Sequence, residues 1–140
     1  MIRGLSIGEV GLIAHTLATH WMGWDEPIPP FSTRFPSKLE SCLATPFQTF
    51  GSRDMYKGLV PKAAVFFYLL VKNHPFQNGN KRIAVTSLLV FLHKNNKWLR
   101  VDNQELYNFA VWVAESPPSV KDQTVAATAQ FIKQNLSDLE

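Results

Sequence analysis

The chain has 140 residues, which is enough for one hydrophobic core and short for two domains. Hydrophobic residues make up 46% and charged residues 18%, a balance that is typical of a globular protein and excludes a disordered chain. The net charge of +3 suits a phosphate-bearing ligand or an acidic partner, but its cations are too scattered to favour nucleic acid.

The cysteine content and the lengths of the apolar runs indicate the cellular compartment of the protein. The single cysteine, Cys42, excludes an intrachain disulfide and argues against a cysteine-based zinc site. The first fifteen residues lack the apolar core and the small-residue cleavage site of a signal peptide. The longest apolar run, Ala63–Val71, is far shorter than a membrane span. These features predict a cytoplasmic protein with no membrane partner.

The N-terminal third predicts a helix and then a loop. Ser6 and Glu9 form a capping-box pattern for a helix that fades near Trp21. The apolar residues expected on its inner face are Val10, Ile13, Ala14 and Leu17. Four prolines within residues 27–36 exclude helix interior and central strand, which predicts an ordered loop. The aromatic residues expected to hold that loop are Trp24, Phe31 and Phe35.

The middle of the chain predicts two short elements and a central helix. A short helix is expected over residues 37–44, and the turn formers within Thr45–Leu59 predict a small hairpin or flap. Pro61 suits the first turn of a helix that is apolar on nearly every side. This helix is expected to end before Pro75, because the residue preceding a proline disfavours helical geometry.

The C-terminal half predicts three further helices. The first runs over residues 80–95, and after a short connection, KWLRV, the second runs over residues 102–115, where Asp102 is its cap. Two prolines break that helix, and Ser119 is expected to cap the last one. The residues expected to face inward on the last helix are Val125, Ala129 and Ile132. No repeat or linker interrupts the chain, so residues 1–140 are predicted to form one mainly α domain.

The stretch HPFQNGNKR, residues 74–82, connects the two apolar helices. A helix N-terminus offers unpaired backbone N–H groups and a partial positive charge, which together suit an anion. Gly79 permits a tight turn and the close approach of a ligand. Lys81 and Arg82 are badly placed for the helix dipole unless an anion lies beside them, and a polyphosphate is the natural candidate.

Three other residues of the stretch suggest reaction chemistry. His74 stands at the mouth of the turn, and imidazole is the usual general base near neutral pH. Asn78 and Asn80 can offer oxygen atoms to a metal or N–H groups to phosphate oxygens. Taken singly, each residue has a simpler interpretation: a solvated histidine, turn-forming asparagines and cations on a solvated helix face. Their occurrence within nine residues favours a nucleotide site.

The stretch resembles the signature HPFx[DE]GN[GK]R of the Fic/Doc family. The matching residues are His74, Pro75, Phe76, Gly79, Asn80, Lys81 and Arg82. Three flanking stretches, LESCLATPFQTFG, KAAVFFYLLVKNHPF and LLVFLHKNNKWL, resemble the death-on-curing (Doc) branch. The resemblance implies a helical bundle with a small β-hairpin flap near the active site.

The resemblance also implies a role for each matching residue. His74 would deprotonate a target hydroxyl and Phe76 would anchor the turn in the core. Gly79 and Asn80 would hold the phosphates, and the two cations that neutralise them would be Lys81 and Arg82. The segment Thr45–Leu59 would be the flap that aligns the target chain. ATP and Mg²⁺ are the implied cofactors.

The residue at position 81 bears on the reaction. Lys81 is the residue that the Doc toxins have at this position of the motif, and in this respect the chain resembles them. Doc toxins transfer the γ-phosphate of ATP to translation elongation factor Tu and are neutralised by a Phd-type antitoxin. Val85 stands where AMP-transferring members have a second arginine. Asn78 stands where the family has an acidic Mg²⁺ ligand, and an asparagine supplies only one neutral oxygen. The expected function is therefore a kinase-like toxin that inhibits translation. AMP transfer and a non-catalytic domain that binds nucleotide or a protein are the alternatives.

Overall fold

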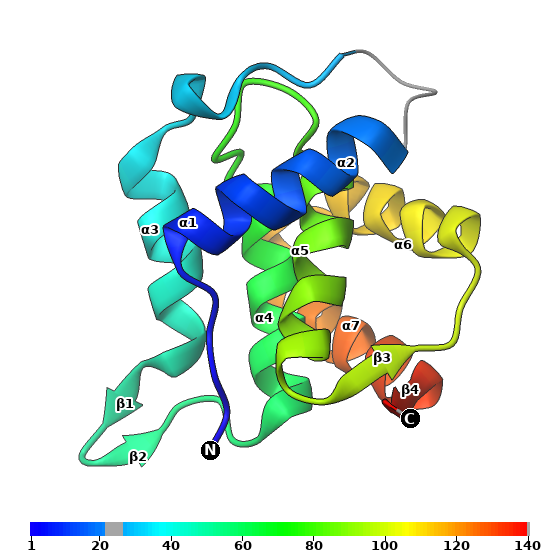
Figure 1. Cartoon of the computed structure of the whole chain (residues 1–140). Helices are drawn as coiled ribbons and strands as arrows, with labels where there is room; N and C mark the ends of the chain where they lie inside the picture. The colour runs from blue at the N-terminus through cyan, green and yellow to red at the C-terminus, as the bar shows by residue number, and fades with distance from the viewer. Residues whose placement is uncertain (22–26, 140) are drawn as a thin grey trace.

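The computed structural model describes residues 1–21 and 27–139, and these residues are mainly helical (Figure 1). The longer helices are α3 (Pro36–Ala44), α4 (Leu59–Lys72), α5 (Asn80–Lys94), α6 (Asn103–Glu115) and α7 (Lys121–Asn135). The N-terminal helix consists of α1 (Ile7–Glu9), the π-helical η1 (Val10–His15) and α2 (Thr16–Trp21). Short 3₁₀ turns are η2 (Phe31–Thr33), η3 (Thr45–Phe47) and η4 (Pro118–Val120). The mainly α prediction is confirmed.

Helix α4 forms the centre of the bundle, as its apolar sequence predicts. Every residue from Lys62 to Val71 is buried, and α5 and α7 pack against it. The buried Lys62 ammonium donates to the Asp54 carboxylate at 3.0 Å and lies 5.7 Å from the Phe47 ring. A buried charge needs such partners, and these attach the segment that precedes α4 to the helix itself.

The N-terminal helix confirms its predicted limits and half of its predicted inner face. Val10, Ala14 and Ala18 are fully buried, whereas Ile13 and Leu17 are 43% and 38% exposed. The π-helical stretch explains the difference, because its wider turn brings residues four apart, rather than three and four apart, onto one line. Trp24 lies outside the described residues, and Phe35, expected to pin the loop, is 41% exposed.

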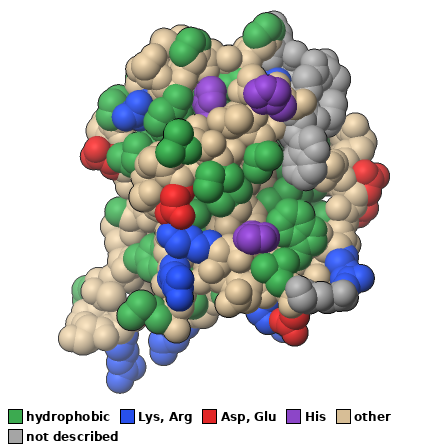
Figure 2. All heavy atoms as spheres, viewed as in Figure 1, with side chains coloured by type: hydrophobic (Ala, Val, Ile, Leu, Met, Phe, Trp, Pro, Cys, Tyr) green, Lys and Arg blue, Asp and Glu red, His purple; other side chains and the backbone are tan. Residues whose placement is uncertain are grey.

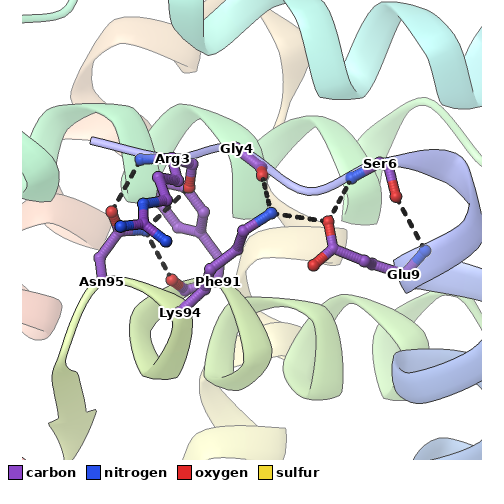
Figure 3. Close-up of polar contacts among 7 residues, drawn as sticks. All are labelled: Arg3, Gly4, Ser6, Glu9, Phe91, Lys94 and Asn95. Atoms are coloured by element: carbon purple, nitrogen blue, oxygen red, sulfur yellow. Dashed lines mark hydrogen bonds and ion pairs between the residues drawn. The ribbon is translucent and has the colours of Figure 1, made fainter. Parts of the chain in front are cut away.

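The start of this helix is tied to the end of α5 (Figure 3). The capping box is present, since Glu9 N–H donates to Ser6 Oγ and Ser6 N–H donates to the Glu9 carboxylate. The Lys94 ammonium donates to Glu9 at 2.8 Å and to the Gly4 carbonyl at 2.9 Å. This hydrogen bond from Lys94 is the main reason that the pKa of Glu9 is lowered.

The predicted hairpin forms within Thr45–Leu59 but lies away from the motif turn. Its strands are β1 (Thr49–Phe50) and β2 (Arg53–Asp54), paired antiparallel. Figure 1 places them at the start of α4, whereas residues 73–79 follow its end. The 14 residues of α4 separate the two by about 21 Å at 1.5 Å per residue. The hairpin is confirmed, and its expected place beside the active site is wrong.

The C-terminal third departs from the sequence-based expectations in three places. The connection after α5 forms β3 (Lys97–Leu99), which pairs antiparallel with β4 (Leu136–Asp138). Ser119 does not cap the last helix, because η4 intervenes and α7 begins only at Lys121. The inner face of α7 contains Thr124, Thr128 and Ile132, while the two other predicted core residues are only partly buried. Each threonine hydroxyl donates to the carbonyl four residues earlier, so its burial leaves no unpaired group.

Hydrophobic side chains also gather on the face occupied by the N-terminal helix (Figure 2). Leu12 is 81% exposed, and two other large hydrophobic residues of the same helix, Ile13 and Leu17, are partly exposed. Among the described residues, none of the helices combines the length and the apolar character needed to cross a membrane.

Candidate functional site

The motif turn connects α4 to α5 through two residues with positive φ. His74 has φ +49°, which is strained for a non-glycine residue, and Gly79 has φ +76°. Gly79 is the N-cap of α5, and its carbonyl accepts the hydrogen bond of Ile83 N–H at 3.0 Å. The expected tight turn is therefore present, and His74 is held in a backbone conformation that residues seldom adopt without support from their surroundings.

Asn80 supplies much of that support. Its Oδ1 accepts from Phe76 N–H and its Nδ2 donates to the Phe76 carbonyl, both at 2.9 Å. The two backbone groups fix the orientation of the amide, because one can only donate and the other can only accept. Nδ2 then lies 3.5 Å from His74 Nδ1. Asn80, predicted to hold phosphates, is 9% exposed, and its side chain braces the turn.

Phe76 occupies the place expected of a loop anchor. It is 4% exposed, and its ring lies 5.9 Å from the Phe31 ring and 6.2 Å from the His15 ring. The second contact comes from the last residue of the π-helical stretch. The anchor therefore joins three parts of the chain, namely the N-terminal helix, the proline-rich loop and the turn.

The proline-rich loop, residues 27–35, lies against the motif turn. Phe35 N–H donates to the Pro75 carbonyl at 2.8 Å, and the His15 ring nitrogen Nε2 lies 2.9 Å from the Pro29 carbonyl. A Cβ atom built on Gly79 would meet Ile28 Cγ1 at 2.7 Å. This loop, rather than the β1–β2 hairpin, is thus the neighbouring segment that covers the turn.

A pocket of about 260 Å³ lies beside the turn. Its lining brings together five of the predicted site residues, which are His74, Asn78, Gly79, Asn80 and Lys81. Arg82 and the anchor Phe76 are absent from the lining, and Arg82 is only 2% exposed. The reason is helical geometry, since Arg82 lies one position beyond Lys81 on α5 and so faces a different side of the helix.

Three residues of the lining were missed by sequence reasoning. Val71, Gln77 and Ala114 complete the pocket. Gln77 lies within the motif stretch and Val71 lies three residues before it, so proximity in sequence could have suggested both. Ala114 comes from the end of α6, where Lys72 donates to the Ala114 carbonyl at 3.1 Å and to the Ser116 carbonyl at 2.6 Å. No local signal could have placed Ala114, because only the packing of α6 brings it to the turn.

The donor set of the pocket does not fit the implied Mg²⁺. Protein-bound Mg²⁺ in nucleotide sites is usually held by one or two carboxylates together with substrate phosphates. The lining contains no Asp or Glu, and across the described residues no cluster of three metal-binding side chains occurs. Asn78, the predicted ligand, directs its Oδ1 to Gly79 N–H at 2.8 Å. These residues therefore do not support a reaction step that runs through a metal.

Two other features of the chain do not offer this chemistry. A second hollow of about 430 Å³ has an almost wholly apolar lining and lacks convergent polar groups, which suits no phosphate. Its lining consists of Ile13, Leu17, Leu89, Val90, His93 and Trp98. Burial raises the pKa of the Cys42 thiol to about 11, so the thiol stays neutral and is a poor nucleophile.

Fold and turn together define a helical domain with a polar, cationic pocket at the N-terminus of a buried helix. The family model described as the Fic/DOC family matches residues 12–92, and the chain belongs to this family, in its Doc branch. The chain is also similar to the Toxin Doc of Mycolicibacterium smegmatis, with 38% identity over 64 residues. That match covers 46% of this chain and 49% of the relative, so the chain spans about half the length of the relative.

Proposed function

We propose that this chain is a Doc-like toxin that transfers the γ-phosphate of ATP to a hydroxyl group of a protein. The observation that supports the proposal is the convergence of His74 and Lys81 on one pocket at the N-terminus of α5. The first is a proton acceptor, and the second is a cation suited to phosphate oxygens. Similarity to a protein named Toxin Doc supports the same class of activity.

The proposed reaction uses His74 as the general base. Because the Asn80 amide presents an N–H group to His74 Nδ1, the neutral ring that accepts this contact carries its proton on Nε2. The basic lone pair is then on Nδ1, where a hydroxyl group that displaced the long 3.5 Å contact would give up its proton. The hydroxyl oxygen attacks the γ-phosphorus, the bond to the bridging β–γ oxygen breaks, and ADP leaves.

Lys81 has the complementary role in this proposal. As a pocket-lining cation in the first turn of α5, it would neutralise the phosphates beside the backbone N–H groups of the helix start. Arg82 is proposed to add positive charge to the start of α5 from a buried position on another side of the helix, without lining the pocket. Asn80 contributes by holding the turn, and hence His74, in place.

The target proposed is translation elongation factor Tu, and the expected consequence is the arrest of protein synthesis. A Phd-like antitoxin is the proposed neutralising partner. AMP transfer is the alternative reaction. It is less well supported, because Val85 stands where AMP-transferring members have a second arginine. A domain that binds nucleotide or a partner without catalysis is the other alternative, and Asn78 favours it.

The test is mass spectrometry of purified elongation factor Tu after incubation with this protein and ATP. A single added phosphate on a Ser or Thr is expected, and His74→Ala should reduce its rate by about 10²–10⁴-fold through loss of the base. Lys133→Ala is the matched control, because this exposed α7 lysine lies outside the pocket lining and should leave the rate unchanged.

The mass of the adduct separates the alternatives. An added AMP would support nucleotidyl transfer. An unchanged target, together with ATP binding that survives in the His74→Ala variant, would support the non-catalytic domain. Equal phosphorylation by the wild type and the His74→Ala variant would contradict the assignment of the base.

A further inference from the structure

The oxygen atoms of the motif pocket are already used by the turn itself. Asn78 Oδ1 accepts from Gly79 N–H at 2.8 Å, and Asn80 Oδ1 accepts from Phe76 N–H at 2.9 Å. These two amides are the ones that the motif would offer to a cation. A metal that took either oxygen would leave a backbone N–H group of the turn without this acceptor, and a backbone N–H group that loses its acceptor is unfavourable.

The charge of the pocket disfavours a cation further. Its lining carries one ammonium group, on Lys81, and no carboxylate. The N-terminus of a 15-residue helix adds a partial positive charge on the same side. A divalent cation held here would meet like charge and find only neutral oxygens, whereas a bare phosphate meets charge of the opposite sign.

From this donor set we infer that the pocket binds the free polyphosphate anion of a nucleotide rather than its Mg²⁺ complex. The inference rests on the proposed function, in which the nucleotide occupies this pocket. Lys81 and the start of α5 supply the positive charge that a metal supplies where the motif has a carboxylate. A phosphate oxygen replaces Asn78 Oδ1 as the acceptor of Gly79 N–H, and the Asn78 side-chain N–H group donates to the same phosphate.

The experiment is a calorimetric titration of the whole chain with ATP, once in EDTA and once in excess Mg²⁺ at matched ionic strength. The wild type should bind ATP in EDTA at least about fivefold more tightly than in Mg²⁺, the lower end of typical coupling between two ligands. Asn78→Asp should reverse the preference, because a carboxylate repels the bare anion and ligates the metal. Peptide mapping before each titration verifies residue 78, since an Asn–Gly pair can deamidate.

A matched variant controls for net charge. Asn108→Asp adds the same negative charge on the exposed face of α6, where Asn108 Oδ1 already accepts from Gln104 Nε2 at 2.9 Å. This variant should keep the wild-type preference for free ATP. Its behaviour distinguishes a metal effect at the turn from a general loss of attraction for anions.

The outcomes separate this inference from the proposed function. Tighter binding of ATP by the wild type in Mg²⁺ than in EDTA, or equal binding in both, overturns the inference and leaves the nucleotide site standing. Absence of ATP binding by the wild type and by Asn78→Asp in both solutions overturns the nucleotide site itself. Reversal in Asn108→Asp as well as in Asn78→Asp also overturns the inference, because the effect would then be one of net charge.

Discussion

At the scale of single residues, the turn is built from side chains whose polar groups are turned inward. Asn80 bonds to both backbone groups of Phe76, and Asn78 bonds to Gly79 N–H. This bonding makes the turn rigid before any ligand binds, which lowers the entropy lost on binding. The positive φ of His74 fits the same view, because strain of about 1–3 kcal/mol persists only where the surroundings impose it.

Gly79→Ala tests how tightly the loop covers the turn. The new Cβ would meet Ile28 Cγ1 at 2.7 Å, and Ile28 is β-branched and so has little rotamer freedom to move away. We expect a loss of stability of about 2–4 kcal/mol, from left-handed strain plus the clash, measured by urea unfolding. Gly51→Ala, with φ +57° and no neighbour within 4 Å, should lose only the strain. Equal losses in the two variants would contradict the close cover by Ile28.

At the scale of elements, the N-terminal helix depends on the end of α5 as well as on its own sequence. Ser6 and Glu9 cap the helix locally, and Lys94 joins that cap to α5 (Figure 3). The same helix contributes His15 to the cover of the motif turn. A change that weakens the cap is therefore expected to disturb the motif turn as well, because the same helix carries His15.

The pH dependence of stability follows from the sign of the shift at Glu9. Its pKa is lowered on folding, so the stabilisation is present above the unfolded pKa of about 4.3 and is lost as pH falls through the folded value. Glu9→Gln keeps the capping geometry without the charge and should lose less than about 1 kcal/mol at pH 7. In thermal unfolding, the difference from the wild type should shrink as the pH falls below the unfolded pKa of Glu9.

The exposed pair of Lys97 and Asp138 provides the control for that measurement. The lysine lowers the pKa of Asp138, but this carboxylate is exposed to solvent, which screens the attraction. Asp138→Asn should therefore change the melting temperature less than Glu9→Gln does. A difference between the wild type and Glu9→Gln that persisted unchanged at pH 3 would show that lost packing, not lost charge, is responsible.

At the scale of the whole molecule, stability is concentrated around α4 and decreases towards the hairpin. Ten consecutive residues of α4 are buried, whereas both strands of the β1–β2 hairpin are exposed. Because locally stable regions are those with many buried apolar contacts, the hairpin should open far more often than the bundle. Lys62 limits this opening by attaching the hairpin residue Asp54 to α4.

Native-state hydrogen exchange tests this gradient. The amides of Val65 to Leu70 should exchange only by global unfolding, with the full free energy of unfolding, usually about 5–15 kcal/mol. The hairpin amides should exchange by local opening at a few kcal/mol or less. Lys62→Met should speed exchange of the hairpin amides. The amides at the centre of α4 should still exchange with the free energy of global unfolding of that variant. Protection of the hairpin equal to that of α4 would contradict the gradient.

Much of the fold follows from local patterns. The capping box at Ser6, the apolar run through α4 and the Asp102 cap of α6 each act over a few residues. Their helices are accordingly found within a few residues of the expected limits. The turn at residues 74–82 was predictable for the same reason, because a proline, a glycine and an apolar helix on either side determine its shape.

What depends on distant segments could not be read from the chain. The pairing of β3 with β4 joins residues 37 to 41 positions apart. Ala114 reaches the pocket through the packing of α6, whose end also accepts hydrogen bonds from Lys72. The hairpin lies at the far end of α4 from the turn because the whole length of α4 separates them. The sequence by itself determined the helices and the residues that gather at the turn, since these depend on neighbouring residues. Only the tertiary structure decided which of their atoms face the pocket. Hydrogen bonding directs the Asn80 amide to the backbone of Phe76, and packing buries Arg82.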